Sequence, residues 1–349
     1  MTEQEYIHLL SILTLSEEPR RAEAQSYVNE LDEEQREILS GIAAAHHVVL
    51  RALGGTSTLP MERFAPALAA EQDRVHRAVA RLYEVCAKLE ANDCPTMVIK
   101  SLDHWPDLGS DLDLLTTSRE SKVISLMRSQ FGATIQTPSW SDRLARKINF
   151  RLPNLPELVE IHFGQLGQAG EQIKLSERIL QNRVQRNLGG LTFWVPAPED
   201  RILLATLQRL YRHYYVRICD VANTRISLQS DDINFDELRR AAKRAGIWPG
   251  VATFLRLSSE YVNHYSGQHL KLPRRVWLAS SFGIEKIYTN SGFLRLPLFP
   301  QGVALYARQL LRAVRRRDPV SSLRLGLVPT LALAANVKFK ITGDENGIW

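Results

Sequence analysis

Acidic residues alternate with leucines in the segment Asp111-Leu112-Asp113-Leu114-Leu115. Alternate residues of a β-strand point to the same face, so this pattern would place two carboxylates side by side while the leucines face a core. Adjacent carboxylates repel each other, and a bridging hard divalent cation relieves the repulsion. An isolated Asp-x-Asp pair is expected by chance in a chain of this length. The apolar residues that alternate with the acids are therefore what favours a metal site here.

A second strand pattern, Leu158-Val-Glu-Ile-His-Phe163, carries a third carboxylate. Its apolar residues would share one face, and Glu160 and His162 would share the other. An edge strand with a solvated polar face would show the same pattern. If the strand instead lies beside Asp111 and Asp113, three acids would meet at one point. Such a group binds two divalent ions, which activate an attacking hydroxyl and hold the phosphates of a nucleotide.

Lys100 and Ser101 end a third apolar run that begins at Thr96. An ammonium group and a small hydroxyl at the end of a strand suit phosphate oxygens, through a point charge and a hydrogen bond. A lysine at this position is also common on protein surfaces. Lys147, farther along the chain, could also reach a triphosphate, but we expect it to be an ordinary surface charge.

Together these segments resemble the polymerase-β-like nucleotidyltransferase superfamily, and most closely its bacterial branch of uncharacterised nucleotidyltransferases. That branch has an apolar strand ending in Lys-Gly, then Asp-h-Asp-h-h, where h is apolar, and later a strand with the third acid, often followed by His and an aromatic residue. The matching segments here are Val98–Ser101, Asp111–Leu115 and Val159–Phe163. Pro198–Asp200 and Arg209–Asp220 are similar to a helical segment that follows in the family. The likeness covers roughly residues 94–265.

The resemblance implies an enzyme that transfers a nucleoside monophosphate from a nucleoside triphosphate, such as ATP, to an acceptor hydroxyl and releases pyrophosphate by a two-metal mechanism. Asp111 and Asp113 would bind both Mg²⁺ or Mn²⁺ ions. Glu160 would bind the catalytic ion and is the candidate base. The nucleotide would be held by Lys100, Ser101, Gly109, Ser110 and Arg217. Two further polar residues, His162 and Asp220, would support the metal ligands.

Three interpretations of the activity stay open at this point. The acceptor is a small molecule or peptide natural product in the first, and tRNA, modified by a toxin-like relative, in the second. In the third, the chain is a nucleotide-binding module whose acids no longer catalyse. Lys100-Ser101 stands where the family has Lys-Gly, and Glu160 stands where Asp is commoner. Arg217 has an alternative partner in Asp220, three residues later on a predicted helix.

Helical and strand patterns succeed one another along the chain and predict an α+β fold. Helical spacing extends to about residue 93 around a loop at 54–60, and further helices are expected at 120–131, 200–214, 217–228, 235–245, 249–265 and 303–317. Strands are expected at 96–100, 110–116, 147–152 and 158–163, with 191–195 added to the same sheet. We therefore predict a small mixed β-sheet nucleotidyltransferase core at 94–196, flanked by a helical N-terminal region, 1–93, and a helical C-terminal region, 197–349.

The composition is that of a globular chain, with 349 residues of which 44% are hydrophobic and 23% charged. Three cysteines without metal-ligand spacing exclude a disulfide scaffold or zinc ribbon and favour a reducing compartment. The N-terminus is acidic before its apolar stretch, unlike a secretory signal. The most apolar window elsewhere, residues 325–337, is too short for a membrane span and contains Pro329. We expect a cytoplasmic protein with no membrane partner.

The net charge of +6 conceals a gradient along the chain. Residues 1–93 carry a net charge of −7, residues 94–267 carry +4 and residues 268–349 carry +9. The densest basic cluster consists of Arg312, Arg315, Arg316 and Arg317. This basic third of the chain suits phosphates or a nucleic acid, or it neutralises the acidic N-terminal third.

Overall fold

The largest sheet of the computed structural model, which we call the central sheet, is mixed and has five strands; the structure describes residues 1–54, 62–230 and 232–342. The strand order is β1-β2-β5-β4-β3. The strands are β1 (Thr96–Val98), β2 (Asp111–Thr116), β3 (Thr134–Ile135), β4 (Lys147–Arg151) and β5 (Leu158–Phe163). Strands β2 and β5 are parallel, and the other neighbours are antiparallel. With helices before and after this sheet, the predicted α+β class is confirmed.

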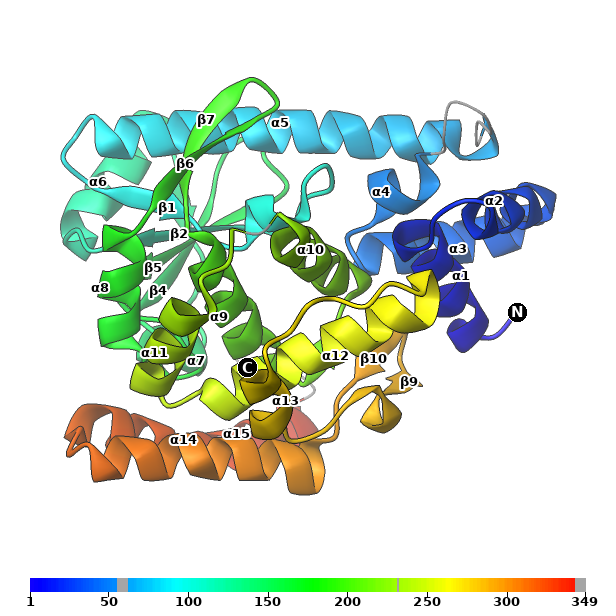
Figure 1. Ribbon diagram of the computed structural model, residues 1–349. Helices are drawn as coiled ribbons and strands as arrows, with labels where there is room; N and C mark the ends of the chain where they lie inside the picture. The colour runs from blue at the N-terminus through cyan, green and yellow to red at the C-terminus, as the bar shows by residue number, and fades with distance from the viewer. Residues whose placement is uncertain (55–61, 231, 343–349) are drawn as a thin grey trace.

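The two faces of the sheet differ in chemistry because the sequences of β2 and β5 alternate. Leu112, Leu114, Val159 and Ile161 are fully buried on one face, in a core shared with helices α5 (Ala65–Glu90) and α6 (Glu120–Phe131). Helix α5 runs along one whole edge of the molecule in Figure 1. The opposite face carries the acids of both strands. Covering one face with apolar helices therefore fixes where the polar side chains must point.

The N-terminal helices share a second hydrophobic core with helices that follow the sheet. The N-terminal helices are α1 (Glu3–Leu15), α2 (Arg20–Glu30), α3 (Glu33–Ala45) and α4 (Val49–Leu53). The later helices are α8 (Ile173–Gln181), α9 (Pro198–Gln208), α10 (Ile218–Gln229), α11 (Phe235–Ala245) and α12 (Trp248–Ser266), whereas the short helix α7 (Trp140–Leu144) lies between β3 and β4. This second core includes Leu10 of α1, Ile218 of α10 and Phe254 of α12. The predicted divisions after residues 93 and 196 stay a prediction.

Two small sheets lie outside the central one. Strands β6 (Val184–Leu188) and β7 (Leu191–Val195) pair only with each other, so the expectation that residues 191–195 extend the central sheet is wrong. Gly189 and Gly190, with φ of 57° and 82°, form the two-residue turn that pairs β7 with β6. The other small sheet has the order β8-β10-β9, with β8 (Tyr215–Val216), β9 (Tyr288–Asn290) and β10 (Phe293–Arg295).

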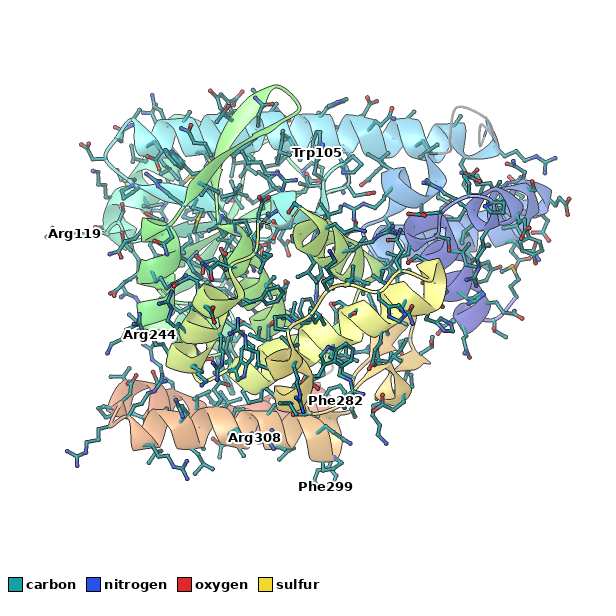
Figure 2. The ribbon with its side chains drawn as sticks, viewed as in Figure 1. Trp105, Arg119, Arg244, Phe282, Phe299 and Arg308 are labelled. Atoms are coloured by element: carbon teal, nitrogen blue, oxygen red, sulfur yellow. The ribbon has the colours of Figure 1, made fainter. Side chains whose placement is uncertain are left out.

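The last helices, α13 (Arg274–Ala279), α14 (Val303–Arg315) and α15 (Pro319–Thr342), complete the fold. Helices α14 and α15 lie side by side at the edge opposite α5 in Figure 1, and Figure 2 shows Phe299 projecting from this edge. Within residues 1–54, 62–230 and 232–342, no helix combines the length and apolar character that a membrane span requires. The predicted loop at 54–60 lies, apart from Gly54, outside the described residues.

Truncating Leu114 should test how much the buried apolar face of β2 contributes to stability. Leu114→Ala removes a side chain of β2 that is fully buried in the core to which α5 and α6 contribute, and such changes cost about 2–5 kcal/mol through lost burial and a residual cavity. We expect a matching loss in the free energy of unfolding, measured in urea. Leu311→Ala, the same change at a residue that is 54% exposed, should cost much less. Equal losses in the two variants would contradict this account of the sheet.

Candidate functional site

The register of the parallel pair β2–β5 sets two acids beside each other. Asp113 is paired with Glu160, and Asp111, two residues earlier on β2, is paired with Leu158. Since alternate residues share a face, Asp111, Asp113 and Glu160 lie on the side of the sheet away from α5 and α6. Asp113 and Glu160 are buried, whereas Asp111 is exposed. The structure therefore brings the three predicted acids to one face, with Asp111 at its open end.

Two lysines neutralise the buried pair of acids. The ammonium group of Lys100 contacts Oδ1 of Asp113, and that of Lys147 lies 2.5 Å from Oε2 of Glu160. Lys147 also pairs with Asp142 at 2.9 Å. The expectation that Lys147 is a surface charge is wrong, because only 6% of its side chain is exposed. Each buried carboxylate thus has a cationic partner, as burial of a charge requires.

His162 completes a group that fits a divalent cation. Its Nε2 lies 2.8 Å from Oε1 of Glu160 and 3.7 Å from Oδ1 of Asp113. Among the described residues, ligand atoms of Asp113, Glu160 and His162 lie within 4.8 Å of one another, and Asp111 is not part of this group. Nδ1 of His162 is buried without a hydrogen-bond partner. Two carboxylates and an imidazole suit ions such as Mn²⁺, and the carboxylates suit Mg²⁺.

Lys100 reaches Asp113 because the chain turns sharply after β1. Lys100 has φ of 67° and ψ of −57°, and the Ser101 N–H donates to the Ile99 carbonyl oxygen over 2.8 Å. This is a γ-turn, a strained conformation for a residue with a side chain. Ser101 then holds the turn against β2, accepting from the Asp113 N–H at 2.7 Å and donating to the Asp111 carbonyl at 2.9 Å. The Ser101 hydroxyl, predicted to bind phosphate, is engaged with the backbone of β2.

The pKa values of Asp111 and Glu160 are shifted in opposite directions. Although Asp111 lies at the open end, partial desolvation by the surrounding residues, together with the charges of Asp113 and Glu160, raises its pKa to about 6. Burial would also raise the pKa of Glu160, but the hydrogen bond and charge of His162 and the ammonium group of Lys147 lower it well below its usual range. Glu160 therefore stays ionised near neutrality, whereas Asp111 takes up a proton in mildly acidic solution.

Lys100 and Asp220 line one small pocket together with Asp103, Arg201 and Asn223. Its volume is about 40 Å³, whereas small-molecule sites usually measure roughly 300–1,000 Å³. Arg201 lies 3.7 Å from Asp103 across this pocket. The two predicted residues are therefore brought together, but a nucleotide would enter here only if side chains moved.

Arg217, predicted to bind the nucleotide, has other partners. Its Nη1 donates to Nε2 of His47 at 2.6 Å, and its guanidinium group lies over the Tyr215 ring, 5.5 Å from the centroid. Its backbone N–H donates to Oδ2 of Asp220 at 2.7 Å, at the start of α10. The side-chain partner of Asp220 is Arg209, at 2.6 Å. The pairing of Arg217 with Asp220 suggested by their spacing is thus a helix cap rather than an ion pair between side chains.

Gly109 and Ser110 are the two residues that directly precede β2. A Cβ atom at Gly109 would make only ordinary contacts, the nearest at 3.5 Å, so the fold does not require glycine there. Arg74 of α5 fixes this segment by donating to the Leu108 and Gly109 carbonyl oxygens at 3.1 and 3.4 Å. Ser110 is exposed. The predicted phosphate role of both residues stays a prediction.

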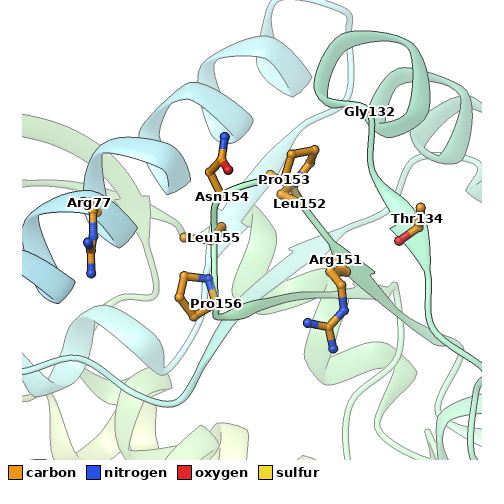
Figure 3. Close-up of a pocket in the computed structure, with 9 residues that line it drawn as sticks. All are labelled: Arg77, Gly132, Thr134, Arg151, Leu152, Pro153, Asn154, Leu155 and Pro156. Atoms are coloured by element: carbon orange, nitrogen blue, oxygen red, sulfur yellow. The ribbon is translucent and has the colours of Figure 1, made fainter.

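A larger pocket, of about 680 Å³, lies at the turn between β4 and β5 and contains none of the predicted site residues. Figure 3 shows Arg77 of α5 on one side of it and the Pro153–Pro156 turn on the other. Lys147 and Asp142 are the residues that sequence reasoning missed. Lys147 begins an alternating strand, Lys-Ile-Asn-Phe, and is paired in register with His162. That alternation was the signal that could have placed its side chain on the acidic face.

No protein-family model and no curated protein matches this chain. Among solved structures, the chain is similar to an antigenic nucleotidyltransferase-like protein from Paracoccidioides brasiliensis. The match has 16% sequence identity and a TM-score of 0.33, and it covers 53% of this chain and 93% of the other. A likeness at this level assigns no activity to the present chain, which must be argued from its own residues.

Replacing Asp111 should change how stability depends on pH. The pKa of about 6 in the folded chain lies above the usual 3.8, so this carboxyl favours folding when protonated, and the benefit is lost as the pH rises through 6. Asp111→Asn should therefore raise the free energy of unfolding at neutral pH, by roughly 1 kcal/mol because the side chain is partly open to solvent. The gain should shrink as the pH falls from about 6 to about 4. Urea unfolding across this range measures it, and a difference that does not vary with pH would contradict the assignment.

Proposed function

We propose that this protein is a metal-dependent nucleotidyltransferase that transfers a nucleoside monophosphate from a nucleoside triphosphate to an acceptor hydroxyl and releases pyrophosphate. The observation that carries the proposal is the β2–β5 register, which sets Asp113 beside Glu160 on the face that also bears Asp111. Their resemblance in sequence to the polymerase-β-like nucleotidyltransferases supports it. We favour a small molecule or peptide natural product as the acceptor.

The proposed role of the acids follows from their surroundings. A bound Mg²⁺ or Mn²⁺ ion would neutralise phosphate oxygens and the charge that develops on the leaving pyrophosphate. Asp113 and Glu160 would hold it, with His162 beside them, and the low pKa of Glu160 keeps that carboxylate in the ionised form a metal ligand needs. A carboxylate with so low a pKa is a weak base, so we propose Glu160 as a ligand rather than as the proton acceptor.

Lys100 is the proposed phosphate contact. Its ammonium group reaches Asp113 from the strained turn after β1 and lines the pocket that extends to Asp220. When a nucleotide enters with its metal ion, we expect this ammonium group to leave Asp113 for a phosphate oxygen. The same ion would then replace the charge that Lys100 supplies to Asp113.

Pyrophosphate release tests the proposal directly. The full chain is incubated with Mg²⁺ or Mn²⁺, each labelled nucleoside triphosphate, and either a small-molecule acceptor pool or total tRNA. We expect metal-dependent release that falls at least about 100-fold in the double variant Asp111→Asn/Asp113→Asn, because it removes the proposed ligand Asp113 and the neighbouring charge of Asp111. Labelled tRNA would identify the toxin-like interpretation instead of the small acceptor.

A matched control separates loss of chemistry from loss of folding. Asp232→Asn/Asp236→Asn changes two exposed aspartates, one three residues before α11 and one in its first turn, and should leave release unchanged. Thermal unfolding of both double variants should show that each is folded. If the Asp111/Asp113 variant releases pyrophosphate at the native rate, the enzyme proposal is wrong.

The two lysine–acid pairs favour a second candidate, a nucleotide-binding module without catalysis. Lys100 already lies against Asp113 and Lys147 against Glu160, so each of these acids has a cationic partner without an ion. For such a module we expect a nucleoside triphosphate to raise the melting temperature, with no pyrophosphate released under any acceptor condition. Lys100→Ala should then abolish the thermal shift, whereas release by the native chain would eliminate this candidate.

A further inference from the structure

Apolar side chains are concentrated on the outer surface of the α14–α15 edge. Of the 18 large apolar side chains that are exposed among the described residues, eight lie between residues 298 and 327. They are Leu298, Phe299, Val303, Leu311, Val314, Val320, Leu323 and Leu327, and we call them the apolar edge. Phe299 is 80% exposed and Leu323 is 65% exposed. So many exposed apolar side chains in 30 residues of one edge indicate an interaction site.

The apolar edge follows helical spacing. At 3.6 residues per turn, Val303, Leu311 and Val314 lie along one stripe of α14, and Val320, Leu323 and Leu327 lie along one stripe of α15. The opposite sides of both helices are held by the fold. Leu305 and Gln309 of α14 are buried, and Gln309 donates to Glu171 at 3.1 Å. The apolar stripes therefore face solvent, while the other sides of the two helices pack against the protein.

Arginines lie next to the apolar stripe of α14. Arg308, Arg312 and Arg315 occupy the neighbouring sector of the helix, and Arg316 and Arg317 follow directly. None of these five arginines forms an ion pair with an acid in the part of the chain that the structure describes. Arg308 donates instead to Ser281, and Arg316 to the Lys243 carbonyl oxygen. The basic charge of this edge is thus available to an anionic partner.

A hollow of about 300 Å³ continues the basic sector toward α11 and α12. Its lining combines Lys243, Arg308, Arg312 and Arg315 with Trp248, Pro249 and Leu311, and contains no acidic residue. The partner must therefore offer negative charge to the arginines and, directly beside it, an apolar phase to the stripe.

We propose that the α14–α15 edge is a peripheral binding surface for membranes that contain anionic phospholipids. The apolar edge would lie in the outer part of the bilayer, and Arg308, Arg312 and Arg315 would contact the phosphates of the lipid headgroups. A nucleic acid would use the arginines but leave aliphatic Leu311, Val314 and Leu323 in water. A second copy of this chain, packed edge to edge, would bring the two sets of arginines together.

This proposal does not depend on the proposed nucleotidyltransferase activity. A peripheral surface needs no spanning helix, so the finding that no described helix could span a membrane does not bear on it. In Figure 2, Phe299 projects from the start of α14 and away from the rest of the molecule, as an inserting side chain would.

Vesicle flotation with the full chain tests the proposal. The chain should float with vesicles of phosphatidylcholine that contain about 30% phosphatidylglycerol, but not with vesicles of phosphatidylcholine alone. Binding should weaken with added salt. Arg308→Glu/Arg312→Glu/Arg315→Glu should lower the partition coefficient at least about tenfold, since each basic residue near an anionic surface contributes. Phe299→Ser/Leu311→Ser/Val314→Ser should lower it comparably through lost insertion.

Matched variants on other elements serve as controls. Arg119→Glu/Lys122→Glu/Arg128→Glu reverses three exposed charges at α6, and Ile226→Ser changes an exposed apolar residue of α10. Both should bind as the native chain does, and thermal unfolding should show every variant folded. The proposal is overturned if the native chain does not float with the anionic vesicles, or if the arginine variant floats equally well. If the chain shifts single-stranded RNA in a gel but does not float, the proposal is wrong and the partner is a nucleic acid. If the native chain forms a dimer that the serine variant abolishes, the proposal is wrong and the partner is a second copy of the chain.

Discussion

The pairing of Asp113 with Glu160 across two parallel strands is the constraint to which the rest of the site responds. Two carboxylates at one level of a sheet repel each other, and burial makes that repulsion stronger than it is in water. Lys100 and Lys147 approach from opposite sides of this pair and balance it. The strained turn at Lys100 and the burial of Lys147 are both explained by this need for positive charge.

The opposite face of the sheet supplies the free energy that holds these charges in place. Leu112, Leu114, Val159 and Ile161 are fully buried, and such residues contribute about 1.5–3 kcal/mol each, or roughly 6–12 kcal/mol together as an upper estimate. This exceeds the few kcal/mol that a poorly balanced pair of buried acids costs. A one-residue slip of β2 against β5 would move the leucines into the polar layer, so the apolar contacts with α5 also fix the register of the acids.

Alternation in the sequence made the central strands predictable, because a period of two assigns each residue to a face. It located Asp111, Asp113 and Glu160 on strands and oriented them, but it could not identify which strands are neighbours. Lys147 was misjudged for that reason, since its burial depends on pairing with β5 over a long separation in sequence. Residues 191–195 pair with β6 and not with the central sheet, and Gly189-Gly190 is the local sequence signal for that hairpin.

The positive charges of the chain act in two different settings. Near the acids they are buried and paired, so they respond to a ligand that enters the site and displaces a partner. Along α14 they are exposed, without acidic partners among the described residues, and next to apolar side chains. Among the described residues, the ion pair that joins a basic residue of 268–349 to an acid outside this range is Arg275 with Asp236. Asp236 belongs to α11, so within the described part of the chain the acidic N-terminal helices do not form ion pairs with the arginines of α14. Exposed charges at this density gain more from an extended anionic surface than from a small ligand, since many weak contacts can form at once.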